Sequence, residues 1–166
     1  DFHMHIALSY QKLNQLREEK FMRAKSQNYY LASYLSSKSV FWHDFLYGEN
    51  CFILENQTIQ PKVKFGNNVM LWSGNHIGHG VQIGNHTYIS SHVVISGHCK
   101  IGERCFLGVN STLRDFCNIG DDCFIGMSSN LTKDLPSGGV AISQSSEIFT
   151  KDDRKAKALK RSYFKI

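Results

Sequence analysis

The sequence predicts a mainly β fold, in which a short strand and a turn repeat as a coil of triangular cross-section. Residues 45–134 divide into fifteen consecutive units of six, and the third place of every unit holds Ile, Leu, Phe or Tyr. A period of six fits neither a helix nor a freely alternating strand, whose periods are about 3.6 and 2. A second period of eighteen means that three units make one turn, with equivalent residues about 4.8 Å apart. It is carried by Gly48, Gly66, Gly84, Gly102 and Gly120.

Within each unit, the places hold distinct residue types. The first place is mostly small or β-branched, and the fourth is glycine in eight of the fifteen units. We expect the third-place aliphatic and the following first-place residue to point inward, and the glycine to permit the backbone of the corner. All five cysteines occupy first places, and they are therefore expected to be buried fillers rather than nucleophiles or ligands. They are Cys51, Cys99, Cys105, Cys117 and Cys123.

The cysteine pattern also indicates the cellular compartment of the protein and whether it has a cysteine-based zinc site. An odd number of cysteines without a signal peptide favours reduced thiols and a cytoplasmic protein. The sequence has no CxxC pair, which argues against a zinc knuckle. No apolar run approaches the roughly 18 residues that a membrane-spanning helix needs, so we expect no membrane span.

The chain before the coil has a different pattern. Residues 3–10 predict a strand, residues 11–27 an amphipathic helix, and residues 28–35 a second strand. We interpret residues 1–38 as the C-terminal part of a small α/β domain that binds a sugar nucleotide. Because this segment lacks an opening glycine-rich loop and begins with Asp1 rather than Met, we expect an N-terminal piece to be missing.

Charge distinguishes the two remaining segments. We expect residues 39–140 to form the coil domain, which is neutral between 51 and 134, with six basic and six acidic side chains. Residues 141–166 form a basic tail, with seven Lys or Arg against two Asp from residue 151 onward. A solvated tail is favoured over an anion contact. No nucleic-acid partner is expected, because the neutral coil has no basic aromatic stripe.

The sixfold pattern resembles the hexapeptide-repeat acyltransferases, whose fold is a left-handed parallel β-helix. More narrowly, the chain is similar to the sugar acetyltransferases of the sialic-acid and bacillosamine pathways, in which a small Rossmann-like domain precedes the β-helix. The match is carried by SGNHIGHGVQIG at 73–84, ISGHCKIGERCFLGVNS at 95–111 and LTKDLPSGG at 131–139. The resemblance implies a homotrimer with acetyl-CoA bound between subunits, a sugar or sugar-nucleotide acceptor, and no metal.

The same resemblance implies the residues of the site. His79 would be the base that takes the proton of the acceptor, since imidazole titrates near neutral pH. Gly97 would donate its backbone N–H to the thioester oxygen, and would also contact the cofactor. Val109 and Met127 would contact the pantetheine of coenzyme A. Tyr88 stands where the family has a second histidine that contacts the acetyl end, and could still offer a hydroxyl.

Two further positions depart from the family pattern. Gly80 follows His79 where the relatives usually have an acidic residue, so another group must orient the imidazole. The closing GxPAK segment of the family is replaced by AISQSS at 141–146. The adenine end of coenzyme A would then be held differently, and the basic tail is a candidate for contacting its phosphates.

The repeat itself gives an independent expectation for part of this site. On the eighteen-residue turn, Gly97 lies one coil above His79, so the base and the oxyanion donor are expected to stack on one edge. His98 neighbours them as a possible supporting residue, and His76, three places before His79, is the alternative base.

The remaining histidines are given structural interpretations. His86 is expected at a solvated corner on a different edge of the triangle, and His92 near the angular position of His76, one coil later. His3, His5 and His43 lie outside the core of the site and are interpreted as surface or packing residues.

Together these observations predict an acetyl-CoA-dependent transferase that acylates the amine of a nucleotide-linked amino sugar for a bacterial surface glycan, such as lipopolysaccharide or capsule. Transfer to a sugar hydroxyl is the alternative. A zinc enzyme like the γ-type carbonic anhydrases is disfavoured, because its ligand pair needs two histidines five residues apart and the sequence has none. A non-catalytic β-helix scaffold is the third possibility.

Overall fold

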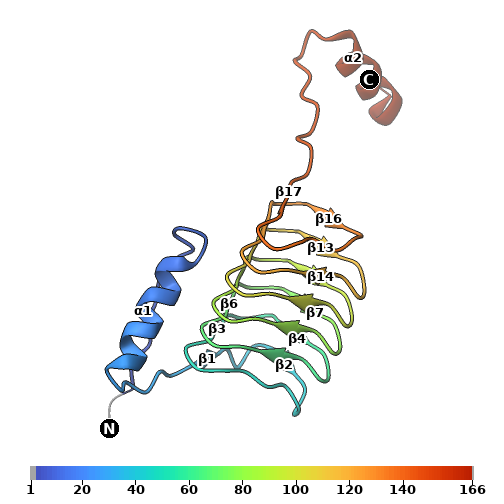
Figure 1. The fold of residues 1–166 in the computed structure, drawn as a ribbon. Helices are drawn as coiled ribbons and strands as arrows, with labels where there is room; N and C mark the ends of the chain where they lie inside the picture. Colours follow the sequence, from blue (N-terminus) through green and yellow to red (C-terminus); the bar gives the residue numbers. More distant parts are fainter. Residues whose placement is uncertain (1–2, 166) are drawn as a thin grey trace.

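The computed structural model describes residues 3–165, and its centre is a stack of triangular coils (Figure 1). Three parallel sheets of seven, six and four strands form the sides of the stack. Each strand is two residues long, and paired residues lie eighteen apart, as in Ile77↔Ile95 and Ile95↔Leu113, except in the last pair, Phe124↔Val140, where they lie sixteen apart. The predicted fold class, a mainly β coil of six-residue units with three units per turn, is confirmed.

The strands alternate between the three sheets along the chain. The seven-stranded sheet contains β1 (Tyr34–Leu35), β3 (Phe52–Ile53), β6 (Met70–Leu71), β9 (Tyr88–Ile89), β12 (Phe106–Leu107), β15 (Phe124–Ile125) and β17 (Val140–Ala141). The six-stranded sheet contains β2 (Val40–Phe41), β4 (Thr58–Ile59), β7 (His76–Ile77), β10 (Val94–Ile95), β13 (Thr112–Leu113) and β16 (Asn130–Leu131). The four-stranded sheet contains β5 (Lys64–Phe65), β8 (Gln82–Ile83), β11 (Lys100–Ile101) and β14 (Asn118–Ile119).

The interior of the coil is filled by the third and first places of the units, as the repeat predicts. The third-place side chains of Ile77, Ile95 and Leu113 are fully buried and stack in register, one coil apart. All five cysteines are buried in the same core, with free thiols. Each coil can bury its apolar residues only against its neighbours, so this continuous column is the main source of stability.

The burial of the cysteines predicts that they are unreactive in the folded protein. Burial raises the pKa of Cys105 to about 12 and that of Cys99 to about 11. Because the thiolate is the reactive form, almost no nucleophile is present at about pH 8. We expect a thiol-specific disulfide reagent to leave the native protein unmodified and to titrate five thiols per chain after denaturation. Rapid modification of the native protein would contradict the packed column.

The corners of the coil correct the role expected for glycine. The sixth place of the unit has the positive φ, at Gly74 and Gly80 but also at residues with side chains such as Asn68, His86 and Arg104, with φ of 58°, 62° and 54°. Asn and His are among the residues that adopt this conformation most readily. The fourth-place glycines are needed for close approach instead, because a Cβ on Gly84 would lie 2.6 Å from the carbonyl carbon of Gly102 in the next coil.

The helix expected at residues 11–27 is present beside the coil as α1 (Gln15–Ser26) (Figure 1). It begins later than expected because Lys12, Leu13 and Asn14 have positive φ values of 52°, 48° and 65°, which a right-handed helix does not allow. Phe21 and Ala24 form its buried apolar contact.

The two strands expected on either side of this helix are wrong in extent. Within the described part of residues 3–10, only Met4 pairs, through a single bridge to Leu31. The strand expected at 28–35 is reduced to that bridge and to β1, which joins the seven-stranded sheet of the coil. Residues 31–35 therefore lead directly into the first coil.

A buried arginine attaches α1 to the coil. Arg17 is 2% exposed, and its guanidinium donates to the carbonyl oxygen of Leu8 at 2.7 Å and to Oδ1 of Asn68 at 3.1 Å. Burial lowers the pKa of Arg17 to about 10, so the side chain stays charged at neutral pH. Asn68 returns a hydrogen bond from its side-chain amide to the carbonyl oxygen of Arg17 at 3.1 Å. These contacts fix the helix against one corner.

His86 belongs to this junction, which corrects the expectation of a solvated corner residue. It is 5% exposed, its Nδ1 lies 2.9 Å from Nδ2 of Asn68, and its ring packs edge-on against Phe21 with centroids 5.4 Å apart. His86 does lie on a different edge of the triangle from His79, as the sequence predicts. The repeat gives no sign that α1 covers this edge and buries the ring.

The buried imidazole predicts a loss of stability at acidic pH. Burial lowers the pKa of His86 below its ordinary value, although the carboxylate of Glu18 opposes the shift. Below about pH 6.5 the unfolded chain therefore binds more protons than the folded protein does. As a result, the free energy of unfolding decreases as the pH falls through that value. In urea unfolding between about pH 7 and 5, we expect His86→Asn to flatten this dependence. The control His92→Asn, at an exposed sixth place, should leave it unchanged.

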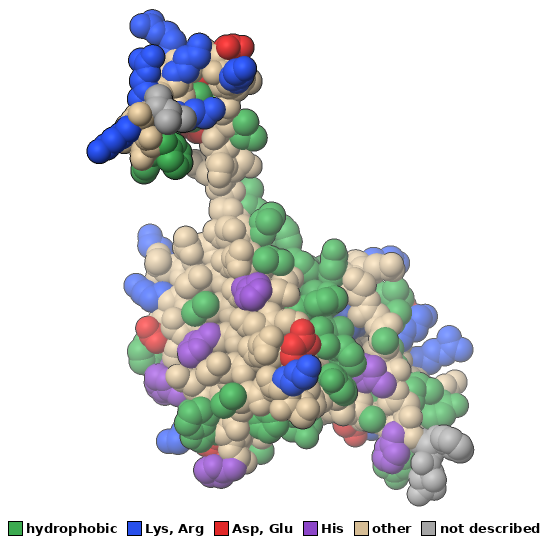
Figure 2. Space-filling model, turned by 180° about the vertical axis from the view of Figure 1, so that it is seen from behind, with side chains coloured by type: hydrophobic (Ala, Val, Ile, Leu, Met, Phe, Trp, Pro, Cys, Tyr) green, Lys and Arg blue, Asp and Glu red, His purple; other side chains and the backbone are tan. Residues whose placement is uncertain are grey.

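The C-terminal tail extends away from the last coil. β17 follows the Pro and Gly residues expected to end the regular repeat, and the chain then runs without strands to α2 (Arg154–Phe164) (Figure 1). Figure 2 shows the basic side chains gathered on this projecting segment, joined to the body by a narrow neck. Among residues 3–165, no helix combines the length and apolar character that a membrane crossing requires.

Candidate functional site

The predicted base and the predicted oxyanion donor meet at the corner between the six-stranded and four-stranded sheets. His79 follows β7 and is exposed, and Gly97 follows β10 one coil above. A Cβ on residue 97 would lie 2.7 Å from Cε1 and 3.0 Å from Nε2 of His79. The imidazole therefore lies over the glycine, in space that any side chain at position 97 would occupy. We refer to Gln60, His79, Gly97, His98 and Asp115 as the histidine corner.

Gln60 holds His79 from the coil below. The backbone N–H of His79 donates to Oε1 of Gln60 at 2.9 Å, and Nδ1 of the ring lies 3.3 Å from the same oxygen. On the other side, the ring of His98 meets that of His79 edge-on, with centroids 4.6 Å apart, and itself stacks on Phe116 at 5.1 Å. Gln60 therefore contacts both the backbone and the ring of His79, and sequence reasoning missed this residue.

The amide of Gly97, the predicted oxyanion donor, already donates a hydrogen bond within the coil. Gly97 N–H donates to Oδ1 of Asp115 at 2.8 Å, one coil further along the same corner. Asp115 is exposed and is the second residue that the sequence analysis missed. The eighteen-residue spacing from His79 to Gly97 to Asp115 is the signal that would have found it.

The other candidate residues lie on different sides of the coil. His76 is on β7, half-buried on the six-stranded sheet, and is near His79 only in sequence. Val109 and Met127 are exposed, one coil apart, at the corner between the seven-stranded and six-stranded sheets. A hollow of about 460 Å³ lies beside Met127, lined also by Phe124 and the chain from Ile142. His92 lies at this corner too, with its ring over Gly74, two residues before His76 on the coil below.

The hydroxyl of Tyr88 lies within an aromatic cluster and accepts one hydrogen bond there. Tyr88 lies on β9 of the seven-stranded sheet, is 5% exposed, and its hydroxyl accepts a hydrogen bond from the indole N–H of Trp72. The rings of Tyr10 and Phe106 cover it at centroid distances of 5.1 and 5.5 Å. Aromatic packing against the N-terminal segment therefore accounts for this residue within one chain.

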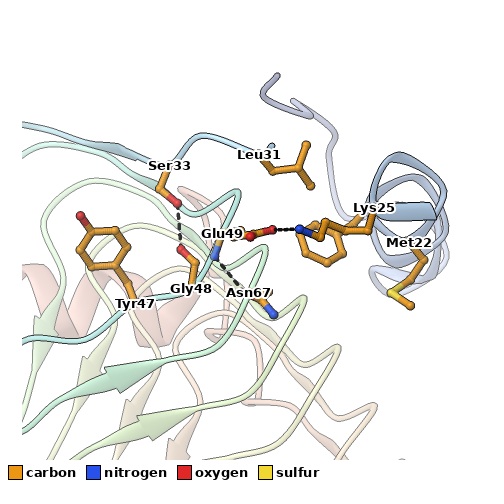
Figure 3. A pocket seen from close by; sticks show the side chains of 9 residues that line it. Met22, Lys25, Leu31, Ser33, Tyr47, Gly48, Glu49 and Asn67 are labelled. Atoms are coloured by element: carbon orange, nitrogen blue, oxygen red, sulfur yellow. Dashed lines mark hydrogen bonds and ion pairs between the residues drawn. The ribbon is translucent and has the colours of Figure 1, made fainter. Parts of the chain in front are cut away.

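A larger hollow of about 630 Å³ lies between α1 and the first coils and contains none of the predicted site residues (Figure 3). Lys25 of the helix and Glu49 of the coil form an ion pair across it at 2.7 Å. The backbone N–H of Glu49 donates to Oδ1 of Asn67 at 2.9 Å, and Ser33 donates to the carbonyl oxygen of Gly48 at 2.9 Å. These polar groups satisfy one another, and the hollow belongs to the junction of helix and coil.

The described residues 3–165 contain no candidate cluster of metal ligands. Among residues 3–165, no group of three or more His, Cys, Asp or Glu side chains is placed to hold a metal ion. In particular, the ring of His79 contacts Gln60 and the ring of His98 stacks on Phe116, and neither of these neighbours is a His, Cys, Asp or Glu ligand.

The comparison with protein families identifies the repeat. The family model for the bacterial transferase hexapeptide, with six repeats, matches residues 62–97 and 98–133. The chain carries bacterial transferase hexapeptide repeats. The two matched stretches include His79, Gly97, Val109 and Met127. The resemblance to the hexapeptide-repeat family is confirmed, whereas no curated protein sequence matches the chain.

Several solved structures share this hexapeptide fold. PerB from Caulobacter crescentus, in complex with CoA and GDP-perosamine, has a TM-score of 0.76 and 21% identity, covering 80% of this chain and 66% of its own. The acetyltransferase domain of PglB from Neisseria gonorrhoeae, in complex with acetyl coenzyme A, has a TM-score of 0.79 and 17% identity, covering 87% and 71%. A mutant of AntD, an N-acyltransferase from Bacillus cereus, in complex with dTDP and coenzyme A, has a TM-score of 0.61 and 14% identity, covering 98% and 99%.

These likenesses establish the fold. The chain spans 66% of the length of PerB, the first of these proteins, so the activity and substrates of the whole enzyme are a matter for proposal.

Proposed function

We propose that this protein transfers an acetyl group from acetyl-CoA to a sugar. The observation that carries the proposal is the ring of His79 lying over Gly97, with its Nδ1 side against Gln60. An exposed imidazole held in this way at a corner of a hexapeptide coil is a base with one free nitrogen. The complexes of PerB and PglB with coenzyme A support the choice of acyl donor.

The chemistry is a direct transfer. The acceptor amine or hydroxyl attacks the thioester carbonyl carbon while Nε2 of His79 takes its proton. The tetrahedral intermediate then collapses, the C–S bond breaks, and the thiolate of coenzyme A leaves, taking a proton from the imidazolium. No covalent acyl-enzyme forms, because the attacking group belongs to the acceptor and the buried cysteines have no access to the thioester.

Stabilisation of the oxyanion by Gly97 requires a rearrangement at Asp115. The Gly97 N–H becomes available when the exposed carboxylate of Asp115 turns away, and the thioester oxygen takes its place. A backbone donor aimed at the developing negative charge is the usual device for acyl transfer, and removal of one such donor typically costs about 100-fold to 1000-fold in rate.

The position of the candidate residues supports a homotrimer with sites between subunits. His79 lies at one corner of the triangle, whereas Val109 and Met127 lie at another. One chain cannot bring both corners to the same ligand, because the packed core separates them. A pantetheine chain bound by Val109 and Met127 of one copy can reach His79 of a neighbouring copy in a closed ring.

The acceptor in this proposal is the amine of a nucleotide-linked amino sugar, for a bacterial surface glycan made in the cytoplasm. The nucleotide complexes of PerB and AntD support this class. Transfer to a sugar hydroxyl is the second candidate, since the same base serves either acceptor. The zinc-enzyme and scaffold interpretations have no specific observation in their favour.

Release of coenzyme A thiol tests the proposal. We expect the protein to release thiol from acetyl-CoA in the presence of a nucleotide-linked amino sugar and not with the matching hydroxyl sugar. The buried cysteines should contribute no background to the assay. Resistance of the product to hydroxylamine would identify an amide, and cleavage would identify an ester. No release with any sugar acceptor would favour the scaffold interpretation, and stoichiometric bound zinc would favour the anhydrase-like one.

A further inference from the structure

We propose that Gln60 is the positioning residue that fixes the tautomer and orientation of His79. This inference rests on the proposed function, in which His79 is the base. Gln60 directly follows the strand β4 (Thr58–Ile59), one coil below β7, so it lies on the same corner as His79 while belonging to a different unit of the repeat. A glutamine thereby takes the place that an acidic neighbour of the base would otherwise fill.

The backbone of His79 determines which end of the Gln60 amide faces the ring. A backbone N–H can only donate, so the atom 2.9 Å from it must be the carbonyl oxygen of the glutamine side chain and not its NH₂. That same oxygen lies 3.3 Å from Nδ1 of the imidazole. An oxygen acceptor shared in this way requires Nδ1 to carry the hydrogen, which leaves the lone pair on Nε2.

The ring that carries this free nitrogen lies over Gly97, where the chemistry is proposed. A Cβ at position 97 would lie 2.7 Å from Cε1, 3.0 Å from Nε2 and 3.2 Å from Nδ1, so Cε1 is the nearest ring atom. His98 meets the ring edge-on at 4.6 Å and restricts its rotation. Gln60 contacts the ring from the coil below, and Gly97 and His98 contact it from the coil above, so these contacts together fix the position of Nε2.

The test compares three variants of the full protein. Gln60→Ala removes the acceptor, Gln60→Glu keeps an oxygen acceptor and adds a charge, and Gln82→Ala changes an exposed glutamine on β8 as a matched control. Two readouts are needed, because loss of activity alone could reflect misfolding. One is the pH profile of kcat and of KM for acetyl-CoA, and the other is the ¹⁵N NMR signature of the His79 imidazole, which reports the tautomer without any substrate.

We expect Gln60→Ala to lower kcat on the order of tenfold to a hundredfold with little change in KM for acetyl-CoA. Its ¹⁵N spectrum should change from a single Nδ1–H tautomer to a mixture. Gln60→Glu should recover activity at high pH, with the acidic limb of the profile moved to higher pH, because a carboxylate stabilises the imidazolium. Gln82→Ala should match the wild type in both readouts.

Two results would overturn the role of Gln60. One is an unchanged tautomer and unchanged kcat in Gln60→Ala. The other is a loss of activity in Gln60→Ala that Gln60→Glu does not recover at any pH, while the tautomer stays that of the wild type. Failure of the proposed function is distinguishable, because a fully active His79→Ala variant would refute the base, whereas the NMR experiment would still decide whether Gln60 sets the tautomer.

Discussion

Replacement of His79 by alanine is expected to abolish acetyl transfer while leaving the coil and coenzyme A binding intact. The exposed ring makes no core contact, so its removal should not change the free energy of unfolding measurably. Loss of a positioned general base typically costs about 100-fold to 10,000-fold in rate. The measurement is kcat from thiol release, combined with a thermal denaturation curve and with coenzyme A binding by calorimetry.

His76→Ala is the matched control for this prediction. His76 is also a histidine of the same coil, three residues earlier, but it lies on the strand β7, whereas the ring atoms nearest to a Cβ at position 97 belong to His79. It should retain near-normal kcat. Retained activity in His79→Ala together with loss in His76→Ala would move the base to His76 and refute the geometric assignment.

Replacement of Ile95 by alanine is expected to lower the free energy of unfolding by about 2–5 kcal/mol, the usual cost of removing a large aliphatic side chain from a packed core. Ile95 has no exposed surface and stacks between Ile77 and Leu113 in the central column. The cavity cannot close, because the pairing of the strands above and below fixes the spacing of the coils. Urea unfolding monitored by circular dichroism measures the change.

Val94→Ala on the same strand distinguishes the contribution of burial to the free energy of unfolding from that of strand propensity. Val94 precedes Ile95 and faces outward with 37% of its surface exposed. Its truncation should cost well under the effect of Ile95→Ala, within about 1 kcal/mol. Equal effects of the two substitutions would mean that the third-place column does not carry the stability of the coil.

The coil was predictable because every unit repeats the same physical requirement. A buried aliphatic at the third place, as at Ile77 and Ile95, recurs whenever the chain passes the core, so the period of the sequence is the period of the structure. The sixth-place conformation was also present in the sequence, since Asn, Asp and His gather there. The fourth-place glycines have no positive φ, and their pattern reflects the close approach of neighbouring coils.

The contacts within the histidine corner were only partly predictable. The stack of His79 and Gly97 follows from the eighteen-residue turn. Gln60 lies nineteen residues before His79, so it occupies a different place of its unit, and only the length of its side chain brings Oε1 to the ring. Asp115 follows the eighteen-residue rule but is linked to Gly97 by a backbone N–H, a donor that a sequence pattern does not display.

The N-terminal segment was less predictable because its partners are not local. Short apolar stretches such as 3–10 suggest strands, but a strand exists only where another strand offers hydrogen bonds. Here Met4 and Leu31 offer each other one bridge, and the remaining apolar surface packs against α1. The same lack of local information concealed the burial of His86, which depends on a helix sixty residues earlier in the chain.

The most direct test of the account is to incubate wild-type protein and His79→Ala with acetyl-CoA and a nucleotide-linked amino sugar, and to identify the products by mass spectrometry. The account predicts one acetyl group gained by the acceptor amine for each coenzyme A released by the wild type, and acetylation at least about 100-fold slower with His79→Ala. Acetylated product in equal yield from both proteins would contradict the role of His79. Intact acetyl-CoA with every sugar acceptor would contradict the proposed reaction itself.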